Sequence, residues 1–220
     1  MLGLSTTNPK DRTMAKSVLE DIQDRLRATR DEMEQELDRQ LEARREQFRY
    51  RLHRGKVRFD HDMQALQKAY RIGLWRYLSG ARIATVLTAP LIYSLAIPLA
   101  LLDLWVTIYQ QVCFRVYGID LVRRSDYVVI DRHHLAYLNG IEKINCVYCG
   151  YGNGVIAYAR EIAGRTEAYW CPIKHARRTV DPHDSFASFM EFGDAETYRD
   201  WLANGRKHKP TGSPDTKSDL

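Results

Sequence analysis

The sequence predicts a mainly α-helical protein with three parts in order: a long charged helix, a hydrophobic membrane-embedded segment, and a small C-terminal α(+β) domain with a Cys3His metal site. Three observations predict this class. Helix formers dominate the first third, the middle is almost free of charge, and two short cysteine motifs lie in the last half. The predicted parts are 1–13 (disordered), 14–70 (long helix), 71–124 (membrane segment), 125–203 (Cys3His domain) and 204–220 (disordered tail).

Composition narrows the class of protein. Four cysteines in 220 residues are too few for a small secreted disulfide scaffold. The net charge of +5 is modest and mixed in sign, which favours an anionic surface as neighbour. The sequence contains no phosphate-binding loop, GxSxG, HExxH or Rossmann pattern, so it favours a non-enzymatic role.

The first predicted element is a helix over residues 14–70, which contain one glycine and no proline. Its apolar residues are three, four or seven positions apart, which places them on one helical face. Such a narrow face needs a second helix, so a coiled coil or helical hairpin is expected, with self-association or a protein partner as its role. The run RLHRGKVRF (51–59) is interpreted as a solvated or lipid-facing helical surface. Acidic residues interleave the arginines of this region, which disfavours nucleic acid as a partner.

The second element is the apolar segment 83–106, whose single charged residue is Asp103. About 20 apolar residues cross the hydrocarbon core of a bilayer, so the segment is predicted to be membrane-embedded rather than a buried core helix. Charge inside such a segment is costly and often functional, although Asp103 also lies near the end of the segment, where it could reach the interface.

Two prolines, Pro90 and Pro98, interrupt the hydrogen bonding of a simple spanning helix. Arginines flank the segment on both sides, and basic flanks mark the cytoplasmic side. A hairpin that turns near the prolines would keep both flanks inside, so a shallow or re-entrant hairpin is favoured over a single span. The predicted location is a bacterial inner membrane, with both end regions cytoplasmic. The flanking arginines are Arg71, Arg76, Arg82, Arg115, Arg123 and Arg124.

The third part reads as a small domain of short elements. DYVVI (126–130) is a strand candidate, and Gly-Asn-Gly at 152–154 indicates a turn before a helix. Glu161 and Arg165 have the spacing of a helical ion pair. Asp194 is expected to cap a final helix.

Cys146 and Cys149 form Cys-x-x-Cys, and Cys171 and His175 form Cys-x-x-x-His. Structural zinc sites commonly join two such short motifs, so these four residues are the predicted metal ligands. Two alternatives stay open: an iron or iron–sulfur centre, and a redox disulfide or inert thiols.

CVYCGY resembles the metal-binding knuckle of rubredoxins and zinc ribbons, and CPIKH is similar to a second knuckle that ends in histidine. This resemblance implies a metal site and not the rubredoxin fold. Residues 137–176, which include NCVYCGYGNG and WCPIKH, resemble a segment of uncharacterised bacterial membrane-associated proteins. The resulting expectation is a membrane-anchored, zinc-stabilised adaptor or scaffold. The alternative is a membrane-bound redox protein that uses iron or a dithiol.

Overall fold

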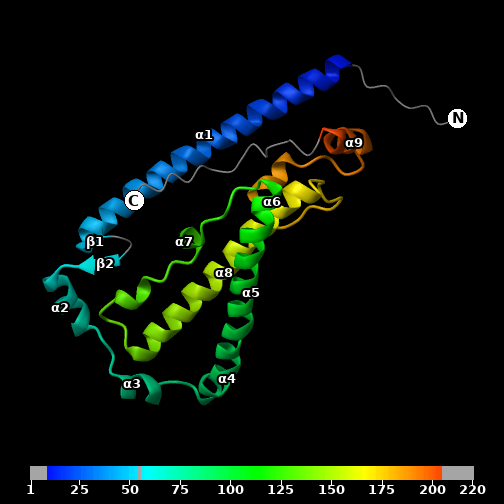
Figure 1. Cartoon of the computed structure of the whole chain (residues 1–220). Helices are drawn as coiled ribbons and strands as arrows, with labels where there is room; N and C mark the ends of the chain where they lie inside the picture. Colours follow the sequence, from blue (N-terminus) through cyan, green and yellow to red (C-terminus); the bar gives the residue numbers. More distant parts are fainter. Residues whose placement is uncertain (1–8, 54–55, 205–220) are drawn as a thin grey trace. The chain divides into compact units, whose positions relative to one another are not determined.

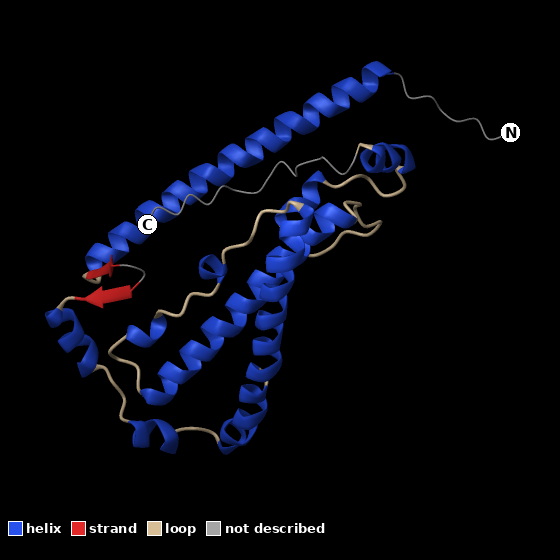
Figure 2. Cartoon of the chain, in the orientation of Figure 1, coloured by secondary structure: helices blue, strands red, loops and turns tan. Residues whose placement is uncertain are grey.

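The computed structural model describes residues 9–53 and 56–204, and the mainly α-helical class is confirmed (Figures 1 and 2). Most of the two predicted disordered ends, 1–8 and 205–220, lies outside the described residues. Residues 9–13, expected to be disordered, belong to the first helix. The chain divides into two compact units, Met1–Ala69 and Tyr70–Leu220, which are described separately.

The first unit begins with helix α1 (Pro9–Gln47), a single helix of 39 residues. Ion pairs one turn apart follow its surface, such as Asp21–Arg25 and Arg30–Glu34, each at 2.9 Å. Such pairs stabilise an exposed helix by about 0.2–0.5 kcal/mol each. The predicted long helix therefore exists.

The expectation that this helix continues to residue 70 was wrong. After Gln47 the chain forms an antiparallel hairpin of β1 (Tyr50–His53) and β2 (Lys56–Phe59), followed by α2 (His61–Ala69). The run 51–59, interpreted above as a helical surface, is therefore mostly strand. The alternation of apolar and polar residues explains the strands, because it places Leu52 opposite Val57 and Tyr50 opposite Phe59, whose rings are 5.5 Å apart.

The second unit starts with α3 (Leu74–Ser79) and continues into one long apolar helix, Ile83–Tyr117, of 35 residues. The parts of this helix are α4 (Ile83–Ser94), α5 (Ala96–Tyr109), the π-helical turn η1 (Gln110–Phe114) and α6 (Arg115–Tyr117). It is long and apolar enough to cross a membrane, judged by length and composition.

The predicted hairpin within this segment is not formed. Pro98 has no N–H to donate to the carbonyl of Ser94, which explains why α4 ends there. The helical pattern resumes at once, because the Leu99 N–H donates to the Leu95 carbonyl at 3.2 Å. Pro90 lies inside α4 without ending it. The prolines thus interrupt the helix locally and do not reverse it.

A second long helix, α8 (Gly140–Trp170), packs against the apolar helix, runs in the same direction and crosses it obliquely (Figure 1). Its start is fixed by a capping box, in which Asn139 accepts from the Glu142 N–H at 3.0 Å and the Glu142 carboxylate accepts from the Asn139 N–H at 2.8 Å. The connection between the helices, residues 118–139, is called the return segment. It contains α7 (Arg124–Tyr127) and the 3-10 turn η2 (Arg132–His134).

Two expectations about this region were wrong. The stretch 126–130 forms no strand, and Gly-Asn-Gly at 152–154 lies inside α8 rather than in a turn. Buried Phe114 and Val122 pack against Tyr158 and Ile162 of α8 and form the core of the unit. The core therefore lies where the apolar helix, the return segment and α8 meet.

Beyond α8 the chain forms loops, the turn η3 (Asp184–Ser188) and α9 (Ala195–Ala203). An isolated parallel bridge joins Ile173 to Met190. The capping prediction is confirmed, because Asp194 accepts a hydrogen bond from the Thr197 N–H at 3.1 Å.

Candidate functional site

The structure places the two predicted metal-binding motifs far apart. Cys146 and Cys149 lie in the first half of α8, Cys171 caps the end of that helix, and His175 lies in the loop beyond it. An α-helix rises 1.5 Å per residue, so Cys149 and Cys171 are about 33 Å apart along the axis. Ligands of one zinc ion each lie about 2.0–2.3 Å from the metal.

The expected turn between the two motifs is thus replaced by continuous helix. Cys149, Cys171 and His175 are exposed, and all four cysteines of the chain are free thiols. Within the residues that the structure describes, no group of three or more His, Cys, Asp or Glu side chains is placed to hold a metal ion. One ion bound by all four residues of a single chain does not fit this arrangement, and the metal set stays a prediction.

The glycines after Cys149 have a packing explanation. A Cβ on Gly154 would lie 2.7 Å from the Tyr127 carbonyl oxygen and 2.8 Å from the Val128 Cα. A Cβ on Gly150 would lie 3.1 Å from the Val129 carbonyl oxygen. These glycines lie one turn apart on α8, and they let the backbone of the return segment approach the helix closely.

The acidic residue of the apolar helix, Asp103, is buried in this interface. Both carboxylate oxygens accept from the Arg124 guanidinium, at 2.9 and 2.6 Å, and one also accepts from the Tyr151 hydroxyl at 3.0 Å. The hydrogen bond to this carboxylate raises the pKa of Arg124. Burial, followed by the hydrogen bond to Asp103, raises the pKa of Tyr151 above its usual 10.0. The cluster therefore joins α5, the return segment and α8 through a paired charge.

A second buried polar layer lies two turns further along. The side-chain amide of Gln110 donates to the Val122 carbonyl at 3.2 Å and accepts from the Val122 N–H at 3.0 Å. It also donates to the Tyr158 hydroxyl, which lies 3.4 Å from the Thr107 hydroxyl. Satisfied buried networks of this kind fix one register between packed elements.

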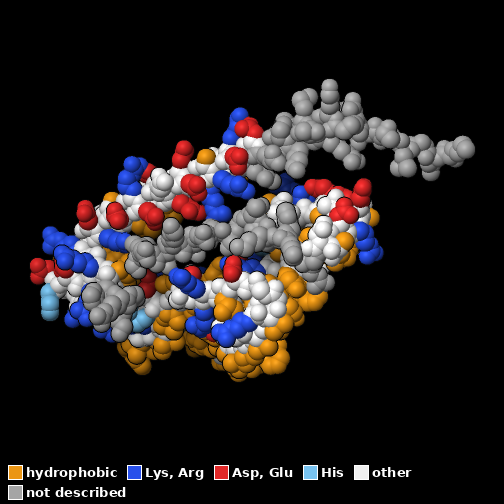
Figure 3. Space-filling view, turned by 45° about the horizontal axis from the view of Figure 1, so that its top comes forward, with side chains coloured by type: hydrophobic (Ala, Val, Ile, Leu, Met, Phe, Trp, Pro, Cys, Tyr) orange, Lys and Arg blue, Asp and Glu red, His pale blue; other side chains and the backbone are white. Residues whose placement is uncertain are grey.

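Outside its interface with α8 and the return segment, the apolar helix is exposed within the described part of the chain. None of its most hydrophobic stretch is buried within the structure. In Figure 3 hydrophobic side chains gather along the lower edge of the view. The large side chains of the helix that are more than half exposed are Ile83, Leu87, Leu91, Leu95, Ile97, Leu101, Leu104, Trp105, Val112 and Val116. We call this set the apolar strip.

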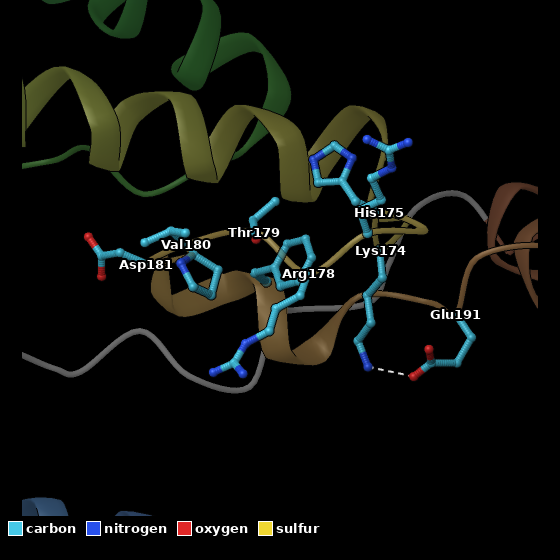
Figure 4. A pocket seen from close by; sticks show the side chains of 10 residues that line it. Lys174, His175, Arg178, Thr179, Val180, Asp181 and Glu191 are labelled. Carbon is cyan, nitrogen blue, oxygen red and sulfur yellow. Dashed lines mark hydrogen bonds and ion pairs between the residues drawn. The ribbon is translucent and has the colours of Figure 1, made fainter.

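The loop after α8 forms an open pocket of about 570 Å³ with a basic rim (Figure 4). His175 and Arg178 are among its lining residues, and Lys174 is directed to Glu191 in an ion pair. Below it, His183 lies 3.0 Å from the Glu167 carboxylate and packs against Gly164. The pocket therefore brings cationic groups together with two carboxylates, those of Asp181 and Glu191.

Comparison of the chain with models of protein families, with curated proteins and with solved structures gave no match.

Asp103 stands out in the sequence, whereas its partners do not. The signal was available, because a carboxylate within an apolar helix requires a cation, and Arg124 was noted only as a flanking charge. Gln110, Tyr151 and Tyr158 carried no such signal, since each resembles an ordinary helical residue until α8 is seen to pack beside the apolar helix.

Proposed function

We propose that this protein is a membrane-anchored scaffold in which the apolar strip binds lipid. One observation supports the proposal above all: a helix of 35 residues exposes large apolar side chains along its whole length. Soluble monomers rarely expose contiguous apolar patches beyond a few hundred Å². Helix α8 packs against the opposite face of the same helix. The described residues of this unit therefore leave the apolar strip uncovered.

The first unit supports the scaffold part of the proposal. Helix α1 exposes a row of apolar side chains, and β1 is the element of its own unit with which it makes substantial contact. Exposed charges surround this row, which suits a second amphipathic helix. A second copy of α1 or a helix of another protein is the partner that this pattern favours. The row consists of Ile22, Leu26, Met33, Leu37 and Leu41.

The anchoring test is membrane fractionation of the full chain followed by an alkaline carbonate wash. We expect the protein to stay in the pellet. The double variant Leu87→Lys and Leu101→Lys should enter the soluble fraction, because lysine in the hydrocarbon costs about 2.5–3.5 kcal/mol per residue. The matched control is Ala163→Lys, on the exposed side of α8. Equal retention of all three proteins would overturn the proposal.

The scaffold test is chemical cross-linking of the full chain in membranes. Leu26 is 65% exposed and Leu37 is 57% exposed, so replacing both by glutamate leaves the fold of the monomer intact. We expect the double variant to lose the cross-linked species of the parent protein. Arg27→Glu, on the same helix but outside the row, is the control for added negative charge.

No contact among the described residues favours the redox alternative, in which the cysteines act as a dithiol or iron site. Cys146 and Cys149 are free thiols on one helix, and residues 9–53 and 56–204 place no cluster of metal-binding side chains beside them. We therefore do not extend the proposal to electron transfer. The zinc role stays a prediction.

A further inference from the structure

We propose that the apolar helix Ile83–Tyr117 lies along the membrane surface, inserted into one anionic leaflet, and does not cross the bilayer. This inference rests on the proposed membrane anchoring and specifies its geometry. Both flanks of the helix then remain on the same side of the membrane.

The apolar strip is longer than the hydrocarbon core of a bilayer is thick. The apolar strip extends from Ile83 to Val116. At 1.5 Å per residue this is about 50 Å, whereas the hydrocarbon core is about 30 Å thick. A crossing helix would leave roughly a third of its exposed apolar side chains in water. A helix parallel to the surface places all of them at the lipid.

Helix α5 has a polar face that packs against α8 and an apolar face that is exposed. Asp103 and Gln110 are buried on the side of α5 that packs against α8, whereas Leu101, Leu104 and Trp105 are exposed. This is the pattern of a helix with one face in lipid and the other covered by protein. The α4 part contains no charged residue and, in this geometry, lies deepest in the leaflet.

Charged residues of the return segment lie near the middle of the apolar helix. Leu99 touches α8 at Gly152. Two residues earlier on α8, Gly150 borders the return segment, where the Arg132 guanidinium would lie 3.9 Å from a Cβ on that glycine. Arg132 is exposed, and Asp131 precedes it. A crossing geometry would carry these charged side chains into the hydrocarbon core at considerable cost, whereas a surface geometry leaves them in water.

Basic residues lie at both ends of the apolar helix. Arg76 and Arg82 precede the helix, and Arg115 and Arg123 lie at or beyond its other end. Basic residues are retained on the cytoplasmic side, where the leaflet is anionic. Because the helix does not reverse its direction, both groups can lie on that side only when the helix does not cross. Anionic phospholipid is therefore the occupant that the charges of both ends favour.

The test is a depth profile of the apolar strip. Spin labels are attached to single cysteines at Leu87, Ile97, Leu104 or Val112, with the four native cysteines replaced by serine. The protein is reconstituted in vesicles of phosphatidylcholine and phosphatidylglycerol. Accessibility to oxygen and to a water-soluble nickel chelate gives the depth of each label. Ala163→Cys, on the exposed side of α8, is the aqueous control.

A surface helix predicts that all four labels lie at similar depth, about 5–10 Å below the headgroups, with α4 deepest. A crossing helix predicts a maximum depth near the middle and two ends at opposite interfaces, because positions 87 and 112 are about 37 Å apart along the axis. That profile would overturn the inference and leave the anchoring intact. Labels open to the nickel chelate would overturn both proposals. Labels shielded from both reagents would mean that a second copy covers the strip, which also overturns the inference.

A second measurement keeps the native cysteines. Reporters that are active only in the cytoplasm are fused to each end of the chain in turn. Activity at both ends is the expected result, and activity at one end only would show that the helix crosses.

Discussion

Replacing Gly154 by alanine should destabilise the second unit, although alanine is the better helix former. Gly154 lies in the middle of α8, where exchange of glycine for alanine would ordinarily gain about 1 kcal/mol. The new Cβ would lie 2.7 Å from the Tyr127 carbonyl oxygen and 2.8 Å from the Val128 Cα. Both are backbone atoms, which cannot rotate away as a side chain can.

The magnitude follows from these two opposing effects. Overpacking of a close contact costs about 1–3 kcal/mol, and the helix-propensity gain returns about 1 kcal/mol. The contact with rigid backbone places the cost in the upper part of this range, so a net loss of about 1–2 kcal/mol is expected. The assay is unfolding by urea in mild detergent, which is monitored by the loss of the helical circular dichroism signal.

Two other glycines of the same helix make the test graded. A Cβ on Gly140 has no neighbour within 4 Å, so Gly140→Ala should stabilise the unit by about 0.4–1 kcal/mol. A Cβ on Gly152 meets only the end of the Leu99 side chain, at 3.2 Å, which can shift. Gly152→Ala should therefore lie between the other two. If Gly154→Ala stabilised the protein as much as Gly140→Ala, the close approach of the return segment to α8 would be refuted.

Three further predictions concern the interface and the cysteines. Arg124→Leu should cost about 2–3 kcal/mol, below the value for a fully buried pair because Arg124 is 43% exposed, and adding Asp103→Leu should recover most of the loss in urea unfolding. Since the pKa of Tyr151 is raised in the folded state, stability should fall as pH rises above 10.0, and Tyr151→Phe should flatten this fall; an unchanged slope would contradict it. Cys149→Ser and Cys171→Ser should each leave the unfolding midpoint and the metal content by mass spectrometry unchanged, because α8 separates the two positions; a joint loss of bound zinc would show that one ion holds both.

Local signals in the sequence were sufficient where the interaction itself is local. The Asp194 cap and the ion pair of Glu161 with Arg165, at 2.7 Å, join residues less than two turns apart, and both predictions are confirmed. The long charged helix was predicted for the same reason, since composition and periodicity act along one stretch of chain. The hairpin at 50–59 was missed because its strands are short and its charges suit an exposed helix equally well.

The candidate site shows where such signals end. The spacing of Cys146, Cys149, Cys171 and His175 is compatible with a zinc site only if the chain reverses between the two motifs. Gly-Asn-Gly at 152–154 was interpreted as a turn that begins this reversal. Glycine permits a turn and also permits close packing of a helix, and only the neighbour of the helix distinguishes the two.

Local composition is enough to predict that this protein is mainly helical and that residues 83–106 are too apolar for an ordinary exposed helix. Those properties follow from composition summed along the chain. The packing of α8 against the apolar helix, the pairing of Arg124 with Asp103 and the separation of the cysteine motifs are visible only in the folded chain. These outcomes depend on contacts between residues far apart in sequence, which no local pattern specifies.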